Sequence, residues 1–471
     1  MGMAGFIAIG IVMAAIVLIV RGRDVRLVLL MASLAIAGGS DLLAGQCAAL
    51  AAIVREFVAT FSNEKFVVPI CTAMGFAYVL RHTGCERHLV LLLVKPLRSV
   101  RGLLVPGIIA VGFLVNIPVI SQTSTAVCIG PVVVPLMRAA GYSLATIGAC
   151  LLLGASLGGE LLNPGAPELL TVFNKTGVST QRQVSEYLPK PVFTQLAVAT
   201  LVAWILSHWW ERKTNVNPAL LSETEPEAPG RINPIKAFVP FVPLVLLFLS
   251  GPPFDLFHVP QNWLVKHPSE TALASVAGPS AAWIGERKLD PSYSSRLIGL
   301  AMMVGVLAAM IASPSRSRDC VKQFFEGAGY GFANIVSLIV TATCFGKAIE
   351  TAGLAAALGR LIAEAPGLLQ PLAALIPLAF AAVSGSGMAS TQSLYGFFYE
   401  PALDHGHDPT AVGSMVALGA AAGRTMSPVA AVTLMCATLT GTNPFTLARR
   451  VAMPLLVGIT VVIILRMSGV Y

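Results

Sequence analysis

Three charged residues lie within apolar stretches of this chain, and they are the first candidates for chemistry. Glu160 and Glu168 belong to the segment GGELLNPGAPELL, and Arg424 belongs to GRTMSPVAAV. A charged side chain at membrane depth needs an opposite charge or a polar cavity, because lipid does not solvate it. We therefore expect Arg424 to meet an anionic substrate, and Glu160 or Glu168 to bind a coupling cation or proton. A purely structural ion pair between Glu160 and Arg424 is the alternative.

The chain interrupts its own helices beside these charges. Residues 163–167 read NPGAP, in which proline removes backbone donors and glycine frees the backbone dihedrals. Ser427-Pro428 interrupts the other segment more mildly. Interrupted backbone at membrane depth is tolerated where it lines a cavity, so both breaks indicate exposed helix ends that bind ligands. Simple proline kinks are the alternative.

Two further stretches place polar residues in the middle of long apolar regions. They read NIPVISQTST (116–125) and SGSGMASTQ (384–392). A polar tip between two apolar legs predicts a re-entrant hairpin, whose hydroxyl groups and free amides suit carboxylate oxygens or a cation. Packing of small residues between helices is the alternative explanation for the serines and glycines.

The predicted substrate-binding residues share a place at one of these tips or breaks. They are Ser121, Gln122, Thr123, Ser124, Thr125, Asn163, Gly165, Ser384, Gly385, Ser386, Gly387, Ser390, Thr391, Arg424 and Ser427. Glu160 and Glu168 are the candidates for ion coupling. If the coupling ion is Na⁺, we expect it near Ser124, Asn163 and Ser390; no other cofactor and no catalytic residue is expected.

The composition requires that the elements carrying these residues cross a membrane. Of 471 residues, 55% are hydrophobic and 11% are charged, against about 25% charged residues in soluble proteins. Apolar runs recur along the whole chain, and each helical crossing needs about 20 residues. The predicted fold class is an all-α polytopic membrane protein with roughly ten transmembrane helices, two re-entrant hairpins and two discontinuous helices.

Three short patterns recur in the same order about 265 residues apart, which indicates an internal repeat. TAMGFAYVLRHTG (72–84) resembles TATCFGKAIETAG (341–353), STAVCIGPVVVP (124–135) resembles STQSLYGFFYEP (390–401), and GELLNP (159–164) resembles GRTMSP (423–428). In the last pair Glu160 and Arg424 occupy equivalent positions.

The predicted organisation follows from this repeat. Residues 1–210 form the first copy, with a hairpin at about 103–138 and a broken helix at about 144–174, and residues 237–471 form the second, with a hairpin at about 371–401 and a broken helix at about 411–440. The polar segment 211–236 is read as a cytoplasmic linker.

The distribution of charge predicts the orientation. Lys and Arg are in excess in the segments assigned to the inside, such as 81–101, but not in those assigned to the outside taken together, such as 44–65 and 251–296. The outside segment 174–190 is the exception, because Lys175, Arg182 and Lys190 outnumber Glu186 there. Both termini are then outside, and the second copy is inverted relative to the first. Inverted repeats are typical of secondary transporters, with the binding site at the bilayer midplane.

At these residues the sequence resembles the anaerobic C4-dicarboxylate carrier family of DcuC type, within the ion transporter superfamily. The resemblance rests on GYGFANIV (329–336), VSGSG (383–387), GRTMSPVAAV (423–432) and NPFTLARRVAMPLLVG (443–458), and more weakly on GFAYVLRHTG (75–84). It implies an inner-membrane carrier for succinate, fumarate and related dicarboxylates, driven by a Na⁺ or H⁺ gradient or by exchange. It also implies an elevator-like motion, a homodimer, and Thr425 as a further substrate-site residue beside Ser384–Gly387, Arg424 and Ser427.

The chain departs from the family in three segments. The acidic segment GGELLNPGAPE (158–168) and the tip SQTST (121–125) are more polar than the resemblance leads us to expect, and segment 251–296 is longer. An ion-coupled transporter of the same fold for another small organic anion or an amino acid is therefore the alternative function.

Other classes of protein fit the sequence less well. An intramembrane enzyme would need a base beside its nucleophile, but all 7 histidines fall in loops or at interfaces, and no HExxH motif occurs. A primary pump would need a nucleotide-binding domain, and the longest polar segment is far too short to form one. Nucleic-acid binding would need a basic stripe interleaved with aromatic residues, and the sequence has no such stripe. A channel stays open as an alternative; a counterflow assay distinguishes it, because only carriers accelerate exchange when substrate is present on both sides.

Overall fold

The chain folds into helices, as predicted. The computed structural model describes residues 3–21, 23–45, 47–95, 101–213, 232–251, 254–265, 292–352 and 366–470, and no strand occurs in these ranges. Eight helical stretches within them are long and apolar enough to cross a membrane, and three shorter apolar helices accompany them. The all-α membrane architecture is thereby confirmed.

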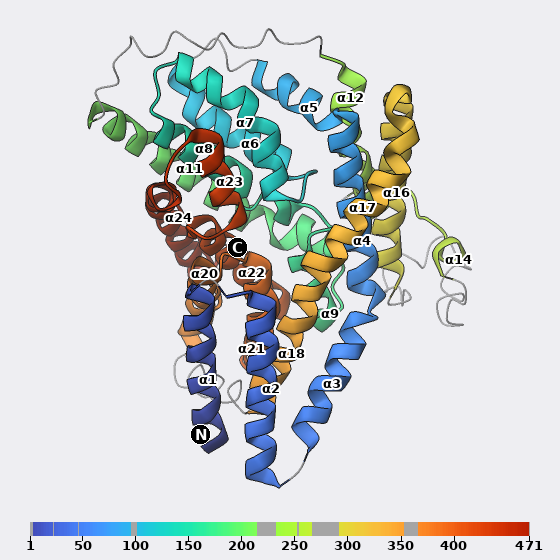
Figure 1. Ribbon diagram of the computed structural model, residues 1–471, viewed down its shortest axis with the longest axis vertical. Helices are drawn as coiled ribbons and strands as arrows, with labels where there is room; N and C mark the ends of the chain where they lie inside the picture. The colour runs from blue at the N-terminus through green and yellow to red at the C-terminus, as the bar shows by residue number, and fades with distance from the viewer. Residues whose placement is uncertain are drawn as a thin grey trace.

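Two long, interrupted helices from the two halves of the chain lie side by side (Figure 1). The first consists of α3 (Ala48–Phe61) and α4 (Glu64–Thr83), and the second of α17 (Cys320–Gly331), the π-helical turn η8 (Phe332–Val336) and α18 (Ser337–Thr351). α4 packs against α17, and α3 packs against α18. The predicted outside segment 44–65 is therefore mostly helix rather than loop.

The neighbours of these long helices are arranged reciprocally. α2 (Val25–Ala44) packs on α18 and on α1 (Met3–Val20), while α16 (Tyr293–Ala312) packs on α4 and on α13 (Val242–Leu249). Two inverted copies of one framework would produce this arrangement. The predicted boundaries at 210 and 237 stay a prediction; residues 214–231 of the linker and 266–291 of segment 251–296 lie outside the described residues.

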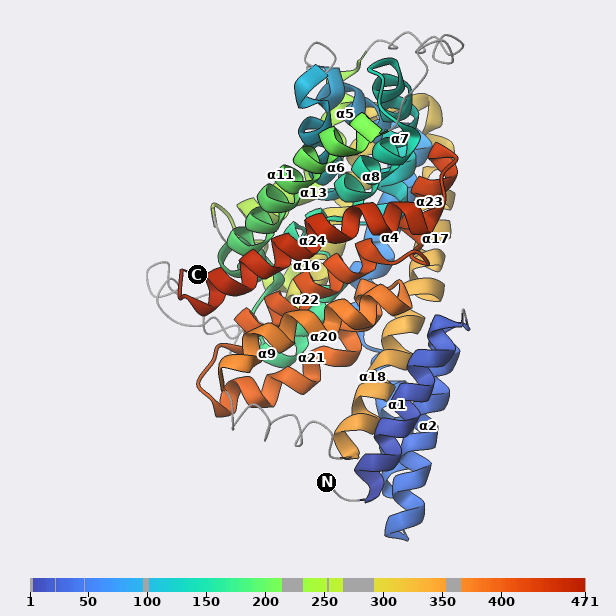
Figure 2. The ribbon, with the colours of Figure 1, turned by 90° about the vertical axis from the view of Figure 1, so that its left-hand side faces the viewer.

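Each half also contains a helical hairpin followed by a helix that stops and restarts. The hairpins are α6 (Leu104–Asn116) with α7 (Gln122–Ala139), and α20 (Leu369–Ser384) with α21 (Gly387–Asp404). The interrupted helices are α8 (Leu144–Ser156), η3 (Gly159–Leu162) and α9 (Pro167–Thr176), and α22 (Pro409–Met426) with α23 (Ala431–Thr440). The last helices of the halves, α11 (Pro189–Lys213) and α24 (Pro444–Met467), lie against each other (Figure 2).

The remaining elements are short and connect these helices. They are α5 (Cys85–Val94), η2 (Arg101–Leu103), α10 (Thr180–Arg182), η4 (Gln183–Tyr187), α12 (Pro234–Phe238), η6 (Val239–Phe241), α14 (Gln261–Leu264), η7 (Pro314–Asp319) and η9 (Pro366–Leu368). α5 follows α4 directly and packs against α7 and α12.

The local sequence explains where the hairpins and interrupted helices turn. Gly158 and Gly385 adopt φ values of 115° and 73°, which residues with a Cβ atom rarely adopt. Pro167 is the first residue of α9, where its missing N–H costs nothing. Ser121 and Ser386 cap α7 and α21, because each side-chain oxygen accepts a hydrogen bond from the N–H of the third helical residue, Ser124 and Ala389 respectively.

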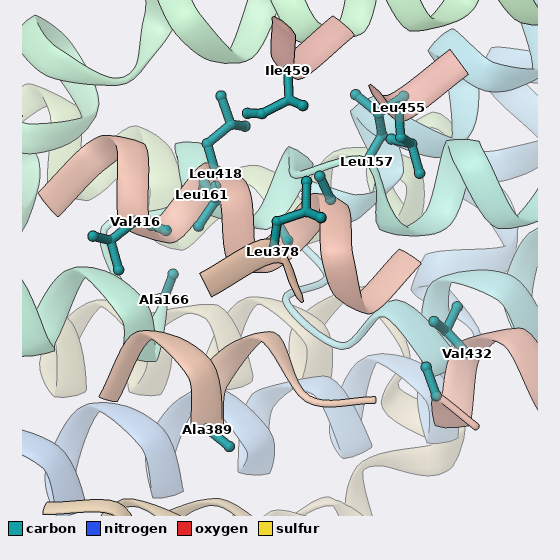
Figure 3. Close-up of a cluster of buried hydrophobic side chains, with 14 of the residues drawn as sticks. Leu157, Leu161, Ala166, Leu378, Ala389, Val416, Leu418, Val432, Leu455 and Ile459 are labelled. Carbon is teal, nitrogen blue, oxygen red and sulfur yellow. The ribbon is translucent and has the colours of Figure 1, made fainter. Parts of the chain in front are cut away.

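A buried apolar core joins the two interrupted helices to the hairpins and to α24. Leu157 and Leu161 of the first break lie near Leu418 of α22, and Leu455 and Ile459 of α24 extend the same cluster (Figure 3). All five side chains are almost fully buried. This core holds the two breaks next to each other.

Glycines allow the hairpins to approach the interrupted helices closely. In α22, a Cβ on Gly419 would collide with the Ala374 carbonyl of α20, and one on Gly423 would collide with the Leu378 carbonyl. Gly112 of α6 and Gly154 of α8 make the equivalent contact in the first half. Such small-residue contacts are a main source of helix association in membranes.

This contact predicts that Gly419→Ala destabilises the protein by about 1–3 kcal/mol, since the added methyl group must push α20 away. The thermal unfolding temperature of the purified protein is the measurement. Gly329→Ala in α17 is the control, because a Cβ there meets nothing within 4 Å. Equal unfolding temperatures for Gly419→Ala and the wild type would contradict the packing argument.

Candidate functional site

The hairpin tips and helix breaks converge on one cavity of about 250 Å³. The first tip contributes Ile120–Thr123, the second contributes Gly385–Met388, and the breaks contribute Pro167, Glu168, Arg424 and Ala430–Val432. The long helices close the other wall of the cavity with Met74, Tyr330, Asn334, Ile335 and Leu338. The cavity thus lies between two structural groups: hairpins with breaks on one wall, and α4, α17, η8 and α18 on the other.

Four helices begin at the wall of this cavity, namely α7, α9, α21 and α23. The first N–H groups of a helix have no partner within the helix, and its dipole favours negative charge there. Ser121 and Ser386 cap α7 and α21, whereas Ala166 and Ala430 at the starts of α9 and α23 give no side-chain cap. The arrangement favours an anionic ligand in this cavity.

Arg424 connects the two breaks. Its Nη2 donates to Glu160 Oε1 at 2.5 Å and to the Ser156 carbonyl at 3.1 Å, and its Nε donates to Ser156 Oγ at 3.2 Å. Thr425 adds a hydrogen bond from its hydroxyl to the same carbonyl at 2.6 Å. The guanidinium is therefore held through Nε and Nη2, both of which point toward the first half of the chain.

The remaining nitrogen of Arg424 points toward the cavity. Nη1 lies 4.0 Å from Glu168 Oε1, which is too long for a hydrogen bond. A Cβ on Gly387 would lie 3.2 Å from the same nitrogen, a tight contact, so glycine at this position leaves more room beside it. Arg424 and Glu168 are 6% and 4% exposed, so their charges are almost fully removed from bulk solvent.

With both carboxylates ionised, the three buried charges do not cancel. Two carboxylates face one guanidinium, and Oε2 of the fully buried Glu160 has no hydrogen-bond partner among the described residues. A buried charge without a full set of partners destabilises the ligand-free protein. A ligand or proton that completes the cluster would reduce this cost.

Polar side chains tie the first tip to the first break. Asn163 donates from Nδ2 to the Ile117 carbonyl at 2.8 Å and accepts from the Gly165 N–H at 2.9 Å. The N–H of Glu160 donates to Asn116 Oδ1 at 3.1 Å. These bonds satisfy backbone groups that the breaks leave without helical partners.

The structure separates the predicted site residues into two groups. Ser121, Gln122, Thr123, Gly385, Ser386, Gly387, Arg424 and Glu168 line the cavity. The side chains of the other group form hydrogen bonds with the backbone beside the cavity. Hydroxyl groups donate to carbonyl oxygens in four cases: Thr125 to Val119 and Ser121, Ser390 to Pro377, Thr391 to Gly387, and Thr425 to Ser156. Ser384 Oγ accepts from the Ser386 N–H, and Asn163 and Gly165 bond to each other.

Two of the predicted positions fall outside both groups. Ser124 donates its N–H to Ser121 Oγ as part of the α7 cap. Ser427 Oγ is buried and has no hydrogen-bond partner among the described residues. The oxygens proposed for Na⁺ at Asn163 and Ser390 already take part in hydrogen bonds.

Sequence reasoning missed the opposite wall of the cavity. Tyr330 and Asn334 sit on consecutive turns of α17 and η8, at a π-helical turn of a kind that often marks functional sites. The signal was present in GYGFANIV (329–336), where two polar side chains interrupt an apolar run. Their distance along the chain from the tips gave no reason to place them at the same site.

Comparison with known proteins agrees with the membrane architecture. The family model for the DcuC C4-dicarboxylate anaerobic carriers matches residues 62–471. The anaerobic C4-dicarboxylate transporter DcuC of Escherichia coli K12 is 24% identical over 408 residues, which cover 83% of this chain and 78% of that protein. A putative uncharacterized transporter of Haemophilus influenzae is 22% identical over 295 residues, which cover 62% of this chain and 95% of that protein.

A solved structure has a similar fold. The crystal structure of the YdaH transporter of Alcanivorax borkumensis, described as having an unusual topology, superposes with a TM-score of 0.58 at 17% sequence identity. The match covers 89% of both chains. At this identity the likeness concerns the fold alone.

The ion pair generates a stability prediction. Arg424→Gln leaves Glu160 buried without a cation and is expected to destabilise the protein by about 3–5 kcal/mol. Adding Glu160→Gln removes the uncompensated charge, so the double variant should regain most of the loss. Thermal unfolding of the two single variants and the double variant measures the coupling; a double variant no more stable than Arg424→Gln would show that the two charges do not interact.

Proposed function

The chain belongs to the DcuC family of anaerobic C4-dicarboxylate carriers, and from this premise we propose how its cavity works in transport. It is a C4-dicarboxylate transporter of the membrane and not an enzyme. The proposed function is secondary active transport of dicarboxylates of the succinate and fumarate class. The observation that carries it is the cavity in which Arg424 Nη1 and four helix N-termini surround one small space.

The geometry assigns a role to each end of such a substrate. One carboxylate accepts from Arg424 Nη1 and from the uncapped start of α23, which lies behind the second tip. The other carboxylate accepts from the start of α9 and from the hydroxyl groups of Ser121 and Thr123 at the first tip. Charge-assisted hydrogen bonds of this kind are stronger than neutral ones and are directional.

Charge balance supports coupling to a proton. With both carboxylates ionised, the cluster of Glu160, Glu168 and Arg424 carries a net negative charge before any ligand arrives. A dianionic substrate adds two more negative charges within a few ångströms, at a large cost in a medium of low dielectric constant. A proton on Glu168, which faces the cavity, lowers that cost, so substrate and proton bind together.

The two walls of the cavity suggest how the site is exposed to each side of the membrane. The ligand contacts of the proposal come mainly from the hairpins and breaks, which a common apolar core and the Arg424–Glu160 pair hold together as one group. We propose that this group moves past α4, α17 and α18 and carries the substrate with it, as in an elevator. Location in the inner membrane and a homodimer are proposed on the family resemblance, and both termini outside on the distribution of charge.

An amino acid is the alternative substrate, and one observation favours it. Glu168 places a carboxylate inside the cavity, where it would accept hydrogen bonds from a substrate ammonium group. Uptake by purified protein in liposomes, measured for succinate, fumarate and a panel of amino acids, separates the two substrate classes. Absence of dicarboxylate uptake under proton-gradient, sodium-gradient and exchange conditions would refute the proposed substrate class.

Arg424→Lys is expected to lower the apparent affinity for succinate in this assay by about tenfold or more. Lysine keeps the charge, but its single ammonium group cannot bind Glu160 and the substrate as the planar guanidinium does. Arg466→Lys, near the end of α24, is the matched control. Unchanged affinity in Arg424→Lys would assign Arg424 to structure alone.

Glu168→Gln is expected to remove the pH dependence of uptake. In the wild type, uptake should rise as the pH on the substrate side falls, because protonation of Glu168 makes room for the dianion. The variant is neutral at every pH and should give a flat profile. Exposed Glu186→Gln is the control, Glu160→Gln is measured in parallel, and replacement of sodium by choline tests Na⁺ coupling. A wild-type profile in Glu168→Gln would place the coupling site elsewhere.

A further inference from the structure

A second polar cavity lies apart from the central one, between α3, α9, α18 and α21. Its volume is about 150 Å³, and its wall contains the charged residues Glu56, Lys175, Lys347 and Glu350. Lys347 pairs with Glu350 at 3.0 Å. No ion-pair partner of Lys175 is found among the described residues, so its ammonium group is available to a ligand.

Two buried side chains at this cavity lack hydrogen-bond partners. Gln392 is 5% exposed and Ser393 is 1% exposed, and both line the cavity. Neither the Oε1 of Gln392 nor the Oγ of Ser393 has a partner among the described residues. Leaving a buried polar atom unsatisfied costs the free energy of its lost hydration, so each such atom in a folded protein calls for an explanation.

The predicted internal repeat places other residues at the positions that correspond to these polar groups. In the register of STAVCIGPVVVP and STQSLYGFFYEP, the positions of Gln392 and Ser393 correspond to Ala126 and Val127 in the first hairpin. In the register of TAMGFAYVLRHTG and TATCFGKAIETAG, Lys347 corresponds to Tyr78. If the two halves share one framework, the first half forms it without these polar groups, which favours a role in binding.

Gln392 also connects the second cavity to the first. Its Nε2 donates to the Pro167 carbonyl at 3.2 Å, and Pro167 lines the central cavity. Lys175 lies eight residues further along α9, so the two sites are roughly 12 Å apart along the helix. A ligand in the second cavity would thus lie close to the central site, beside the same helix.

We propose that this second cavity is a peripheral binding station for a dicarboxylate that carries a hydroxyl or ammonium group. The ammonium groups of Lys175 and Lys347 bind the carboxylates, and Ser393 Oγ donates to one of them. Gln392 Oε1 can only accept, so it selects a ligand with a donor of its own. The identity of the ligand class rests on the proposed function.

The test measures binding to the full-length protein in lipid nanodiscs, with L-malate and succinate as probes. The wild type should bind two molecules of L-malate per chain. The Glu160→Gln/Arg424→Gln variant, which disables the central site while removing both partners of its ion pair, should bind one. The remaining site should prefer L-malate to succinate by at least about fivefold, the discrimination expected of one hydrogen bond.

Two substitutions in that variant then probe the second cavity. Lys175→Gln should weaken the remaining binding about tenfold. Ser393→Ala should weaken L-malate binding while raising the unfolding temperature of the ligand-free protein, because it removes a buried hydroxyl that has no partner. A purely structural role does not produce these opposite effects. Lys190→Gln, at the start of α11 and away from the cavity, is the control.

The outcomes separate this proposal from the proposed function. A single L-malate per wild-type chain that is lost completely in Glu160→Gln/Arg424→Gln would overturn the second site and leave the central site standing. Residual binding unaffected by Lys175→Gln and Ser393→Ala would also overturn it. Two L-malate molecules per wild-type chain, with the remaining binding weakened by both Lys175→Gln and Ser393→Ala, would support the second site. If neither probe binds the wild type, both proposals are refuted.

Discussion

Arg424 and Glu160 meet 2.5 Å apart where the two interrupted helices come together, and the rest of the site depends on this contact. Two charges at membrane depth persist only with partners, and here Ser156 accepts from the guanidinium while Thr425 donates to the same Ser156 carbonyl. Because Nη2 pairs with Glu160 and Nε donates to Ser156 Oγ, Nη1 of Arg424 stays free for a ligand. A structural ion pair and a binding role are therefore compatible, although the sequence presented them as alternatives.

The interrupted backbone is subject to the same constraint. Each break frees N–H and C=O groups that lipid cannot satisfy, and nearby side chains form hydrogen bonds with such groups instead. Asn116 and Asn163 bind the first break to the first tip, and Ser390 binds the two legs of the second hairpin through the Pro377 carbonyl. Polar residues at the tips thus have two roles: some line the cavity, and others hold its shape.

The two halves pack their helices in similar ways but carry different polar side chains at equivalent positions. The packing of α4 on α16 and α17 is repeated by α18 on α2 and α3, and each hairpin approaches its interrupted helix through glycine contacts. The side chains at equivalent positions differ where ligands are expected: Glu160 faces Arg424, and Gln392 stands where the first half has Ala126. Because these side chains differ, each half would contribute different contacts to a ligand.

The sequence by itself determined the membrane class, the helical architecture and the polar tips and breaks, because scarce charge, proline and glycine act locally and need no tertiary contact to be interpreted. It also singled out Glu160, Glu168 and Arg424, since a charge in an apolar run is costly wherever the chain folds. Only the tertiary structure decided that Ser121 and Gly387 line the cavity while Thr125 and Ser390 bond to the framework, because the direction of a side chain depends on its neighbours. It alone brought Tyr330 and Asn334 to the opposite wall and Lys175 to a second cavity, since those contacts join segments far apart along the chain.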